Sequence, residues 1–158
     1  MFTLGSDPEF FVSNGEYCIP SVVKILDGEI KPVIEDSKHP IIVSTDNFNV
    51  IVDGVALEVN FKVPFWSFEE IKDQFWQAVK LSENLYEKVS VVPTIKFNLS
   101  PFTKYMGNEL FFQGVIFGCD PDKDAFNVKW AAKVIDALTH NLRYGGGHIH
   151  FGFPPNID

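Results

Sequence analysis

Hydrophobic and polar positions alternate along much of the first hundred residues, and this period of two predicts strands rather than helices. The clearest runs are Phe48–Ile51 and Val55–Val63, on either side of Asp53-Gly54. A turn between two alternating runs predicts a pair of antiparallel strands packed on one face. Further short apolar segments separated by turn residues predict strands at Phe2–Leu4, Phe10–Val12 and Val22–Leu26.

One segment has helical spacing instead. Ser67 is followed three residues later by Glu70, the pattern of a helix-capping box. Apolar residues then recur at the spacing of one helix face, so the sequence predicts a helix from about residue 67 to 88. The residues that define this face are Phe68, Ile71, Phe75, Ala78, Val79, Leu85 and Tyr86.

The second half of the chain predicts more strands. Val89–Leu99 reads as a strand interrupted at Pro93, and Leu110–Phe117 reads as another. Phe126–Leu142 fits either an amphipathic helix or a long covering loop. We therefore expect one α+β domain over residues 1–158, in which an antiparallel sheet carries one main helix on one face.

Composition narrows the class of protein. With 158 residues, of which 46% are hydrophobic and 15% aromatic, the chain is long enough to bury a substantial core. Its formal net charge of -8 argues against nucleic acid or an anionic membrane as a partner, because phosphate contacts need clustered Lys and Arg. Cys18 and Cys119 lack metal-binding spacing, and no apolar run approaches the roughly 18 residues that span a bilayer. We expect a reduced, cytoplasmic protein with no membrane insertion.

Candidate chemistry is densest near the end of the chain, in the segment Arg143–Gly152. His148 and His150 are two residues apart, so on a strand both imidazoles project to the same face, as a metal or an anionic ligand requires. The glycines at 145–147 allow backbone or a ligand to approach closely. From spacing alone, a half-exposed strand face explains the two histidines equally well.

Acidic residues form three further clusters. Asp7 and Glu9 lie within one turn at a strand edge, and Glu58 and Asn60 share a strand face. The third cluster surrounds Asp120 in an acidic turn. All three offer the oxygen donors that Mg²⁺ prefers, although each separately is also explained by an ordinary turn or a solvated strand face.

Taken together, four ordered segments resemble the phage-type carboxylate–amine ligases, the amidoligase type 2 group of the glutamine synthetase and glutamate–cysteine ligase superfamily. The resemblance extends from residue 5 to residue 153 and implies a phage-encoded enzyme in the host cytoplasm. It implies a curved antiparallel sheet that holds two or three Mg²⁺ ions around the phosphates of ATP. The segments are Gly5–Phe10, Asp53–Asn60, Gly118–Asp122 and Arg143–Gly152.

The resemblance also implies roles for individual residues. Glu9 and Glu58 are the expected main metal ligands, and Glu58 with Arg143 is expected to act in catalysis. His148 or His150 completes the metal and phosphate site. The expected nucleotide-binding residues are Arg143, Gly145, Gly146, Gly147 and His150, and weaker candidates beside the metal ligands are Asp7, Asn60 and Asp120.

The implied reaction forms an amide bond in two steps. ATP first converts a carboxylate to an acyl phosphate, and an amine then displaces the phosphate. Mg²⁺ neutralises the phosphates, and Arg143 stabilises charge as it develops. The carboxylate and the amine are small molecules or peptides that the sequence does not specify.

Members of this family continue well beyond the two histidines, whereas this chain ends at Asp158. The resemblance therefore predicts that a second polypeptide, or a second copy in a homo-oligomer, completes the site. Two alternatives stay open at this point. One is a non-catalytic scaffold of the same fold that binds a partner or peptide, and the other is a hydrolase in which Glu9, Glu58 and the two histidines hold Zn²⁺ or Mn²⁺.

Overall fold

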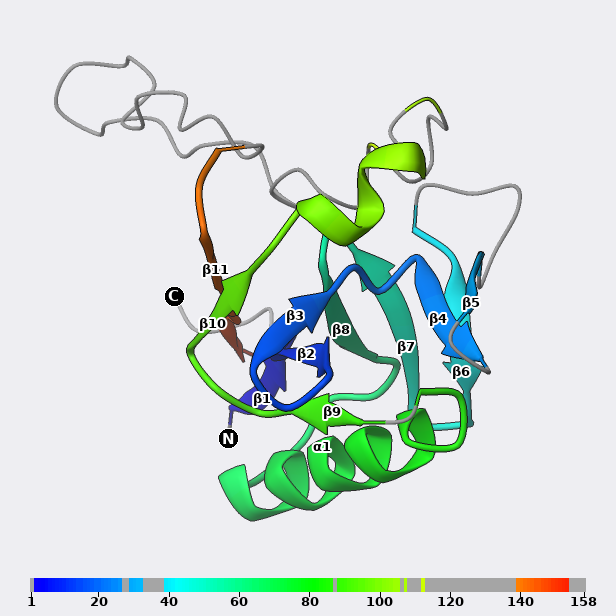
Figure 1. The fold of residues 1–158 in the computed structure, drawn as a ribbon. Coiled ribbons are helices and arrows are strands. Elements are labelled where there is room, and N and C mark those ends of the chain that lie inside the picture. The colour runs from blue at the N-terminus through cyan, green and yellow to red at the C-terminus, as the bar shows by residue number, and fades with distance from the viewer. Residues whose placement is uncertain are drawn as a thin grey trace, which may run out of the picture.

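The computed structural model describes residues 2–26, 29–32, 39–86, 88–105, 107, 112 and 139–153 (Figure 1). Within these residues the chain forms short strands, one α-helix and one 3₁₀-helix. In chain order they are β1 (Thr3–Ser6), β2 (Glu9–Ser13), β3 (Tyr17–Ile19), β4 (Val23–Leu26), β5 (Glu29–Pro32), β6 (Ile41–Ser44), β7 (Phe48–Asp53), β8 (Ala56–Phe61), α1 (Phe68–Ser82), β9 (Val89–Ser90), β10 (Thr94–Phe97), η1 (Ser100–Tyr105), β11 (Leu142–Tyr144) and β12 (Ile149–Gly152).

The main sheet has the strand order β11-β10-β3-β2-β8-β7-β6, and β9 also pairs with β2. The predicted α+β class is confirmed, and so are the strand pair around Asp53-Gly54 and the break at Pro93. The prediction of an antiparallel sheet is wrong for one pair, because β10 lies parallel to β3. β8 and β3 are both antiparallel to β2 and so run in the same direction. The connection from β8 to β10 includes α1, and a helical connection of this kind joins strands that run parallel to each other.

The start of α1 is the predicted cap. The Ser67 Oγ accepts a hydrogen bond from the Glu70 N–H at 3.3 Å, and the Glu70 carboxylate accepts one from the Trp66 N–H at 2.8 Å. The first bond satisfies a backbone donor that the first turn of a helix leaves without a partner, and the second fixes the residue before the cap against the same turn.

The end of the helix was predicted wrongly, because α1 stops at Ser82 and not at about 88. The next turns tighten, with the Leu85 N–H donating to the Ser82 carbonyl at 3.0 Å. This turn brings Tyr86 into the core, where its hydroxyl donates to the Ser21 carbonyl. A tertiary contact therefore ends a helix whose apolar spacing would have continued.

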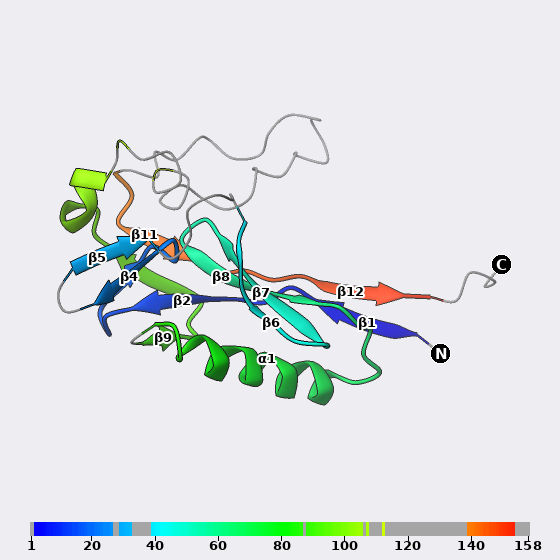
Figure 2. The same ribbon diagram turned by 90° about the vertical axis from the view of Figure 1, so that its right-hand side faces the viewer.

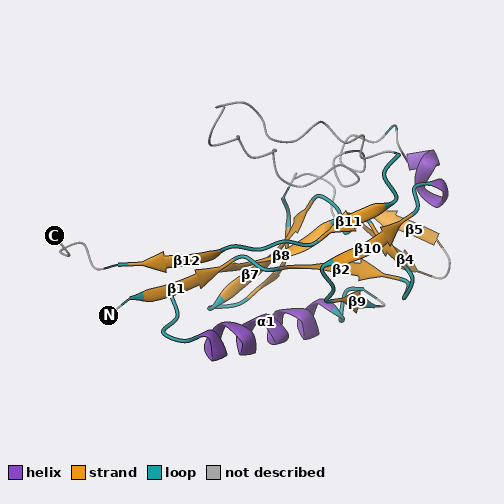
Figure 3. Ribbon diagram, turned by 90° about the vertical axis from the view of Figure 1, so that its left-hand side faces the viewer, coloured by secondary structure: helices purple, strands orange, loops and turns teal. Residues whose placement is uncertain are grey.

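The two faces of the main sheet differ. Figures 2 and 3 show α1 running along one face, where Phe10, Leu57 and Val59 are fully buried and the Phe10 and Phe75 rings meet edge-on at 5.9 Å. Because strand side chains alternate, Glu9 and Glu58 project from the opposite face of the same strands.

A separate two-stranded ribbon lies at one end of the sheet. In it β12 pairs antiparallel with β1, so that His150 is opposite Gly5, and Leu4 forms a bridge to Phe65 beside α1. The ribbon extends beyond the sheet in Figure 2. It brings the two histidines next to the acidic segment at the start of the chain.

Some predictions fall outside the described residues. They are the strand at 110–117, of which only residue 112 is described, and most of the ambiguous segment at 126–142. Among the described residues, no helix is both long enough and apolar enough to cross a membrane.

Candidate metal centre

Three carboxylates converge on the face of the sheet away from α1. Glu9 on β2 is directly opposite Glu58 on β8. Asp53 ends the neighbouring strand β7, and one ligand oxygen from each of the three carboxylates lies within 4.8 Å of the other two. An all-oxygen set of this size suits a hard divalent cation.

Asp53 was not predicted as a site residue, because Asp53-Gly54 was interpreted as a turn. The turn is tight because Gly54 adopts a φ of 58°, and Asp53 therefore pairs with Ala56. Glu58 is two residues beyond Ala56 and shares its face, so Asp53 is the diagonal neighbour of Glu58. The two-residue turn was visible in the sequence and was the signal that identifies this third carboxylate.

Burial and neighbouring carboxylates disfavour the ionisation of Glu9 and Glu58. Burial, followed by the charges of Asp53, Asp7 and Glu9, raises the pKa of Glu58 to about 7. Burial also raises the pKa of Glu9, although a hydrogen bond from the Gly146 N–H opposes this. The His39 Nδ1 lies 3.5 Å from the Asp53 Oδ1, at the edge of the cluster. A bound cation would relieve this repulsion.

Asp7 joins the two predicted histidines. The His148 Nδ1 lies 3.0 Å from the Asp7 Oδ2, the His148 backbone N–H donates to Asp7 Oδ1, and the His150 Nε2 lies 3.5 Å from the Asp7 Oδ2. Burial acts to raise the pKa of Asp7, but the hydrogen bonds from His148 outweigh it and hold that pKa below its usual value. Asp7, predicted as a weaker candidate, is thus the residue that holds the pair together.

The histidines and the carboxylates share one electrostatic environment. The charge of His148 lowers the pKa of both Glu9 and Glu58, and the charge of Asp7 raises it. The structure therefore brings together four of the predicted site residues from segments about 140 positions apart in the chain. They are Glu9, Glu58, His148 and His150.

The three glycines pack against β2. The Gly146 N–H donates to the Glu9 Oε2 at 2.7 Å, and the Glu9 N–H donates to the Gly146 carbonyl at 3.0 Å. Gly147 has a φ of 151°, and a Cβ there would lie 3.0 Å from Pro8 Cα. A Cβ on Gly145 would lie 3.2 Å from the Phe11 ring. Close packing explains Gly145 and Gly147 without a ligand, whereas a Cβ on Gly146 would make only ordinary contacts with Glu9. Contact of the three glycines with nucleotide stays a prediction.

The structure does not bring Arg143 to the carboxylates. Its side chain is fully buried, the guanidinium carbon lies 4.0 Å from the centre of the Phe97 ring, and Nη1 donates to the carbonyls of His140 and Leu142 at 2.8 and 2.9 Å. Burial lowers the pKa of Arg143 from its usual value. We therefore leave Arg143 out of the proposed site.

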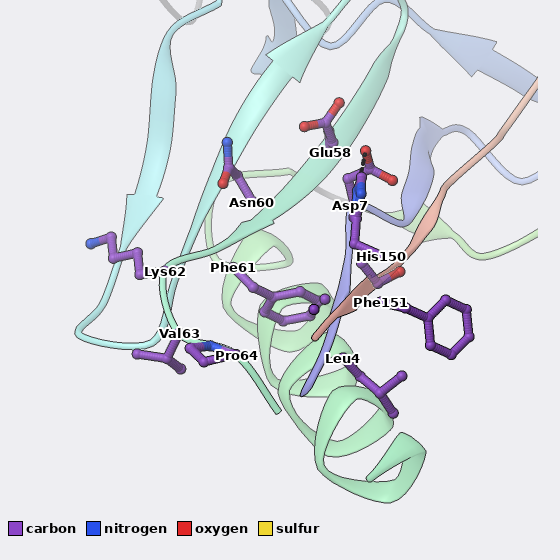
Figure 4. A pocket seen from close by; sticks show the side chains of 13 residues that line it. Leu4, Asp7, Glu58, Asn60, Phe61, Lys62, Val63, Pro64, His150 and Phe151 are labelled. Atoms are coloured by element: carbon purple, nitrogen blue, oxygen red, sulfur yellow. Dashed lines mark ion pairs between the residues drawn. The ribbon is translucent and has the colours of Figure 1, made fainter. Parts of the chain in front are cut away.

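A groove of about 510 Å³ adjoins the carboxylates, between β8 and the β1–β12 ribbon (Figure 4). Asp7, Glu58, Asn60 and His150 line its inner end. Asn60 therefore faces the groove, as its place two residues after Glu58 predicts. Asp120, the last of the predicted candidates, lies outside the described residues.

Comparison with protein-family models, with characterised proteins and with solved structures yields no match for this chain. The resemblance to carboxylate–amine ligases accordingly stays a prediction.

Proposed function

We propose that this protein is a ligase that uses ATP and Mg²⁺ to join a carboxylate to an amine. The observation that carries the proposal is the convergence of Glu9, Asp53 and Glu58 within 4.8 Å of one another on one sheet face. The order of the four sequence segments supports the ligase class, because it resembles that family from residue 5 to residue 153. The family's expected second polypeptide or second copy is part of the proposal.

The donor set favours Mg²⁺ over Zn²⁺. Zinc sites in proteins usually include nitrogen or sulfur ligands, whereas the three clustered groups here are all carboxylates. Both imidazoles instead direct a ring nitrogen toward Asp7. This arrangement argues against the alternative zinc hydrolase, in which the two histidines would bind the metal themselves.

Glu9, Asp53 and Glu58 are the residues that would hold the cation, and the donor set fits that role. When bound, the cation would neutralise phosphate charge and orient the γ-phosphoryl group. An oxygen of the substrate carboxylate attacks the γ-phosphorus and ADP leaves, which yields the acyl phosphate. The amine nitrogen then attacks the acyl carbon, phosphate leaves, and the nitrogen loses a proton to give the amide.

His148 and His150 border this site, and Asp7 fixes their orientation. We assign them to the phosphate side of the site, because imidazole N–H groups are suitable donors to phosphate oxygens. The groove beside them offers space for the amine and carboxylate substrates.

Calorimetric titration with a non-hydrolysable ATP analogue, in Mg²⁺ and again in EDTA, tests the proposal. We expect binding in Mg²⁺ and none in EDTA. Cation binding without nucleotide binding would overturn the ligase assignment in favour of the hydrolase. Absence of both, with the protein folded, would instead favour the non-catalytic scaffold.

A further inference from the structure

The segment that contains β1 and continues to Pro8 is joined at two points to the segment that runs from Val59 on β8 to Phe65, and the two segments separate between these points. At one point the Val59 N–H donates to the Pro8 carbonyl at 3.0 Å, and at the other Leu4 and Phe65 exchange two backbone hydrogen bonds of 2.7 Å each. Between these points, no backbone hydrogen bond in the described part of the chain joins residues 5–7 to residues 60–64. The opening coincides with the groove in Figure 4.

The ladder pattern shows which backbone groups point into this opening. Lys62 donates its N–H to the Asn47 carbonyl at 2.8 Å, toward β7, so the N–H and C=O of the preceding Phe61 point the other way, toward β1. In the same way Asp7 donates its N–H to the His148 carbonyl at 3.4 Å, so the backbone groups of Ser6 point toward β8. Both strands thus present a donor and an acceptor to the opening.

The side chains around the opening have a polar end and an apolar end. Asp7 and Glu58 lie at the inner end, beside the metal centre, while Val63 and Pro64 lie at the outer end. The Lys62 ammonium donates to Ser44 Oγ and to the Thr45 carbonyl, on the side of the strand away from the two carboxylates. Asp7 is paired with the two imidazoles, whereas Glu58 has no ion pair among the described residues, so Glu58 is the carboxylate that gives the inner end its negative character.

We propose that this groove binds the amine substrate, and that this substrate is a short peptide or peptide-like molecule with a free amino terminus. The inference rests on the proposed ligase function. An extended peptide pairs its backbone with exposed strand groups such as those of Ser6 and Phe61. Its ammonium group is drawn to Asp7 and Glu58, which places the nitrogen beside the metal centre, and an apolar side chain packs near Val63.

The size of the groove agrees with this occupant. A volume of about 510 Å³ lies within the roughly 300–1,000 Å³ that is usual for small-ligand sites. One or two residues of peptide occupy such a space, and a longer peptide would project past Val63 into solvent.

Two matched probes test the inference on the full chain. They are Leu-Gly amide and N-acetyl-Leu-Gly amide, which differ only in the free ammonium group. In a nitrogen-15 NMR titration with Mg²⁺ present, we expect Leu-Gly amide to shift the backbone amide signals of Ser6 and Phe61. Acetylation should weaken binding at least about tenfold, because it removes the charge that Asp7 and Glu58 attract. Equal affinity for both probes, or no shift at either amide, would overturn the inference.

A pair of Val→Trp variants tests the location. Val63 lines the groove and Val91 does not, and the two side chains are 40% and 39% exposed. We expect Val63→Trp to lose peptide binding and Val91→Trp to keep it, while both retain Mn²⁺ binding. Peptide binding that survives in Val63→Trp would overturn the location.

The Mg²⁺-dependent titration with the ATP analogue separates failure of this inference from failure of the proposed function. If the analogue binds and the peptide does not, the groove assignment is wrong and the ligase proposal stands. If neither binds, both are wrong.

Discussion

The two faces of strand β8 differ, because one contributes to the hydrophobic core and the other to the candidate metal centre. Leu57 projects toward α1 and is fully buried, and its neighbour Glu58 projects to the other side and joins two more carboxylates. The same alternation occurs on β2, where Phe10 is buried in the core and Glu9 belongs to the candidate metal centre. Rigid packing on one face thus holds the charged groups on the other in place.

The faces also differ in what they contribute to stability. Burial of Leu57 removes apolar surface from water and favours folding. Burial, followed by the charges of Asp53, Asp7 and Glu9, raises the pKa of Glu58 to about 7, so the ionised form of Glu58 opposes folding until a cation is bound. We infer that the site is maintained for binding at the expense of stability, which is common at functional sites.

The largest effect is expected on the helix face. Leu57→Ala should lower the free energy of unfolding by about 3 kcal/mol, because it leaves a cavity in the core. Urea unfolding in EDTA measures this change. The matched Glu58→Gln, one residue away, should leave stability at neutral pH unchanged or higher, because it removes one of three repelling charges. A loss of stability in Glu58→Gln equal to that in Leu57→Ala would contradict the contrast between the faces.

A smaller effect is expected for binding on the other face. Glu58→Gln should weaken Mn²⁺ affinity roughly 30-fold, because one charged ligand of three becomes neutral. Calorimetry with Mn²⁺, followed by the Mg²⁺–ATP analogue, measures the loss. Glu16→Gln is the control, since Glu16 is an exposed carboxylate whose ion-pair partner is Lys96. Unchanged Mn²⁺ affinity in Glu58→Gln would remove Glu58 from the metal centre.

The smallest effect is expected from pH. Protons compete with the cation for Glu58, whose pKa is about 7, so Mn²⁺ affinity should rise about tenfold between pH 6 and pH 8. In EDTA, where no cation is bound, the free energy of unfolding is expected to depend on pH in the opposite direction. The folded state binds this proton more tightly than the unfolded state, whose pKa is near 4.5, so stability should fall as pH rises from about 4.5 to about 7.

Glu58→Gln provides the control for both pH dependences, because it cannot titrate at this position. Its Mn²⁺ affinity and its stability in EDTA should vary less with pH than those of the unmodified protein. Identical pH profiles in the two proteins would show that another group causes the dependence.

Local features of the fold were predictable from the sequence. The β7–β8 pair follows from alternation around Asp53-Gly54, and the start of α1 follows from Ser67 and Glu70, because the interactions involved span only a few residues. The end of α1 was not predictable in this way. It depends on the hydrogen bond from Tyr86 to Ser21, between residues 65 positions apart.

The candidate site residues also divide into those that the sequence identified and those whose location depended on distant contacts. The residue types at Glu9, Glu58, His148 and His150 marked them as candidates, and the structure places them together. Arg143 was also a candidate by type, yet it is buried against Phe97. Charged residues are rarely buried, so sequence reasoning places such a residue at the surface by default.

What the sequence by itself determined is most of the strands, the cap of α1 and which side chains share a strand face, because these depend on alternation and on contacts between near neighbours. The short strands β3, β5 and β6 were not predicted. Only the tertiary structure decided that β2 lies beside β8 and that β12 lies beside β1. Those pairings place Glu9 opposite Glu58 and His148 beside Asp7. They could not be read from local pattern, since strand pairing between distant segments depends on how the whole sheet packs against its core.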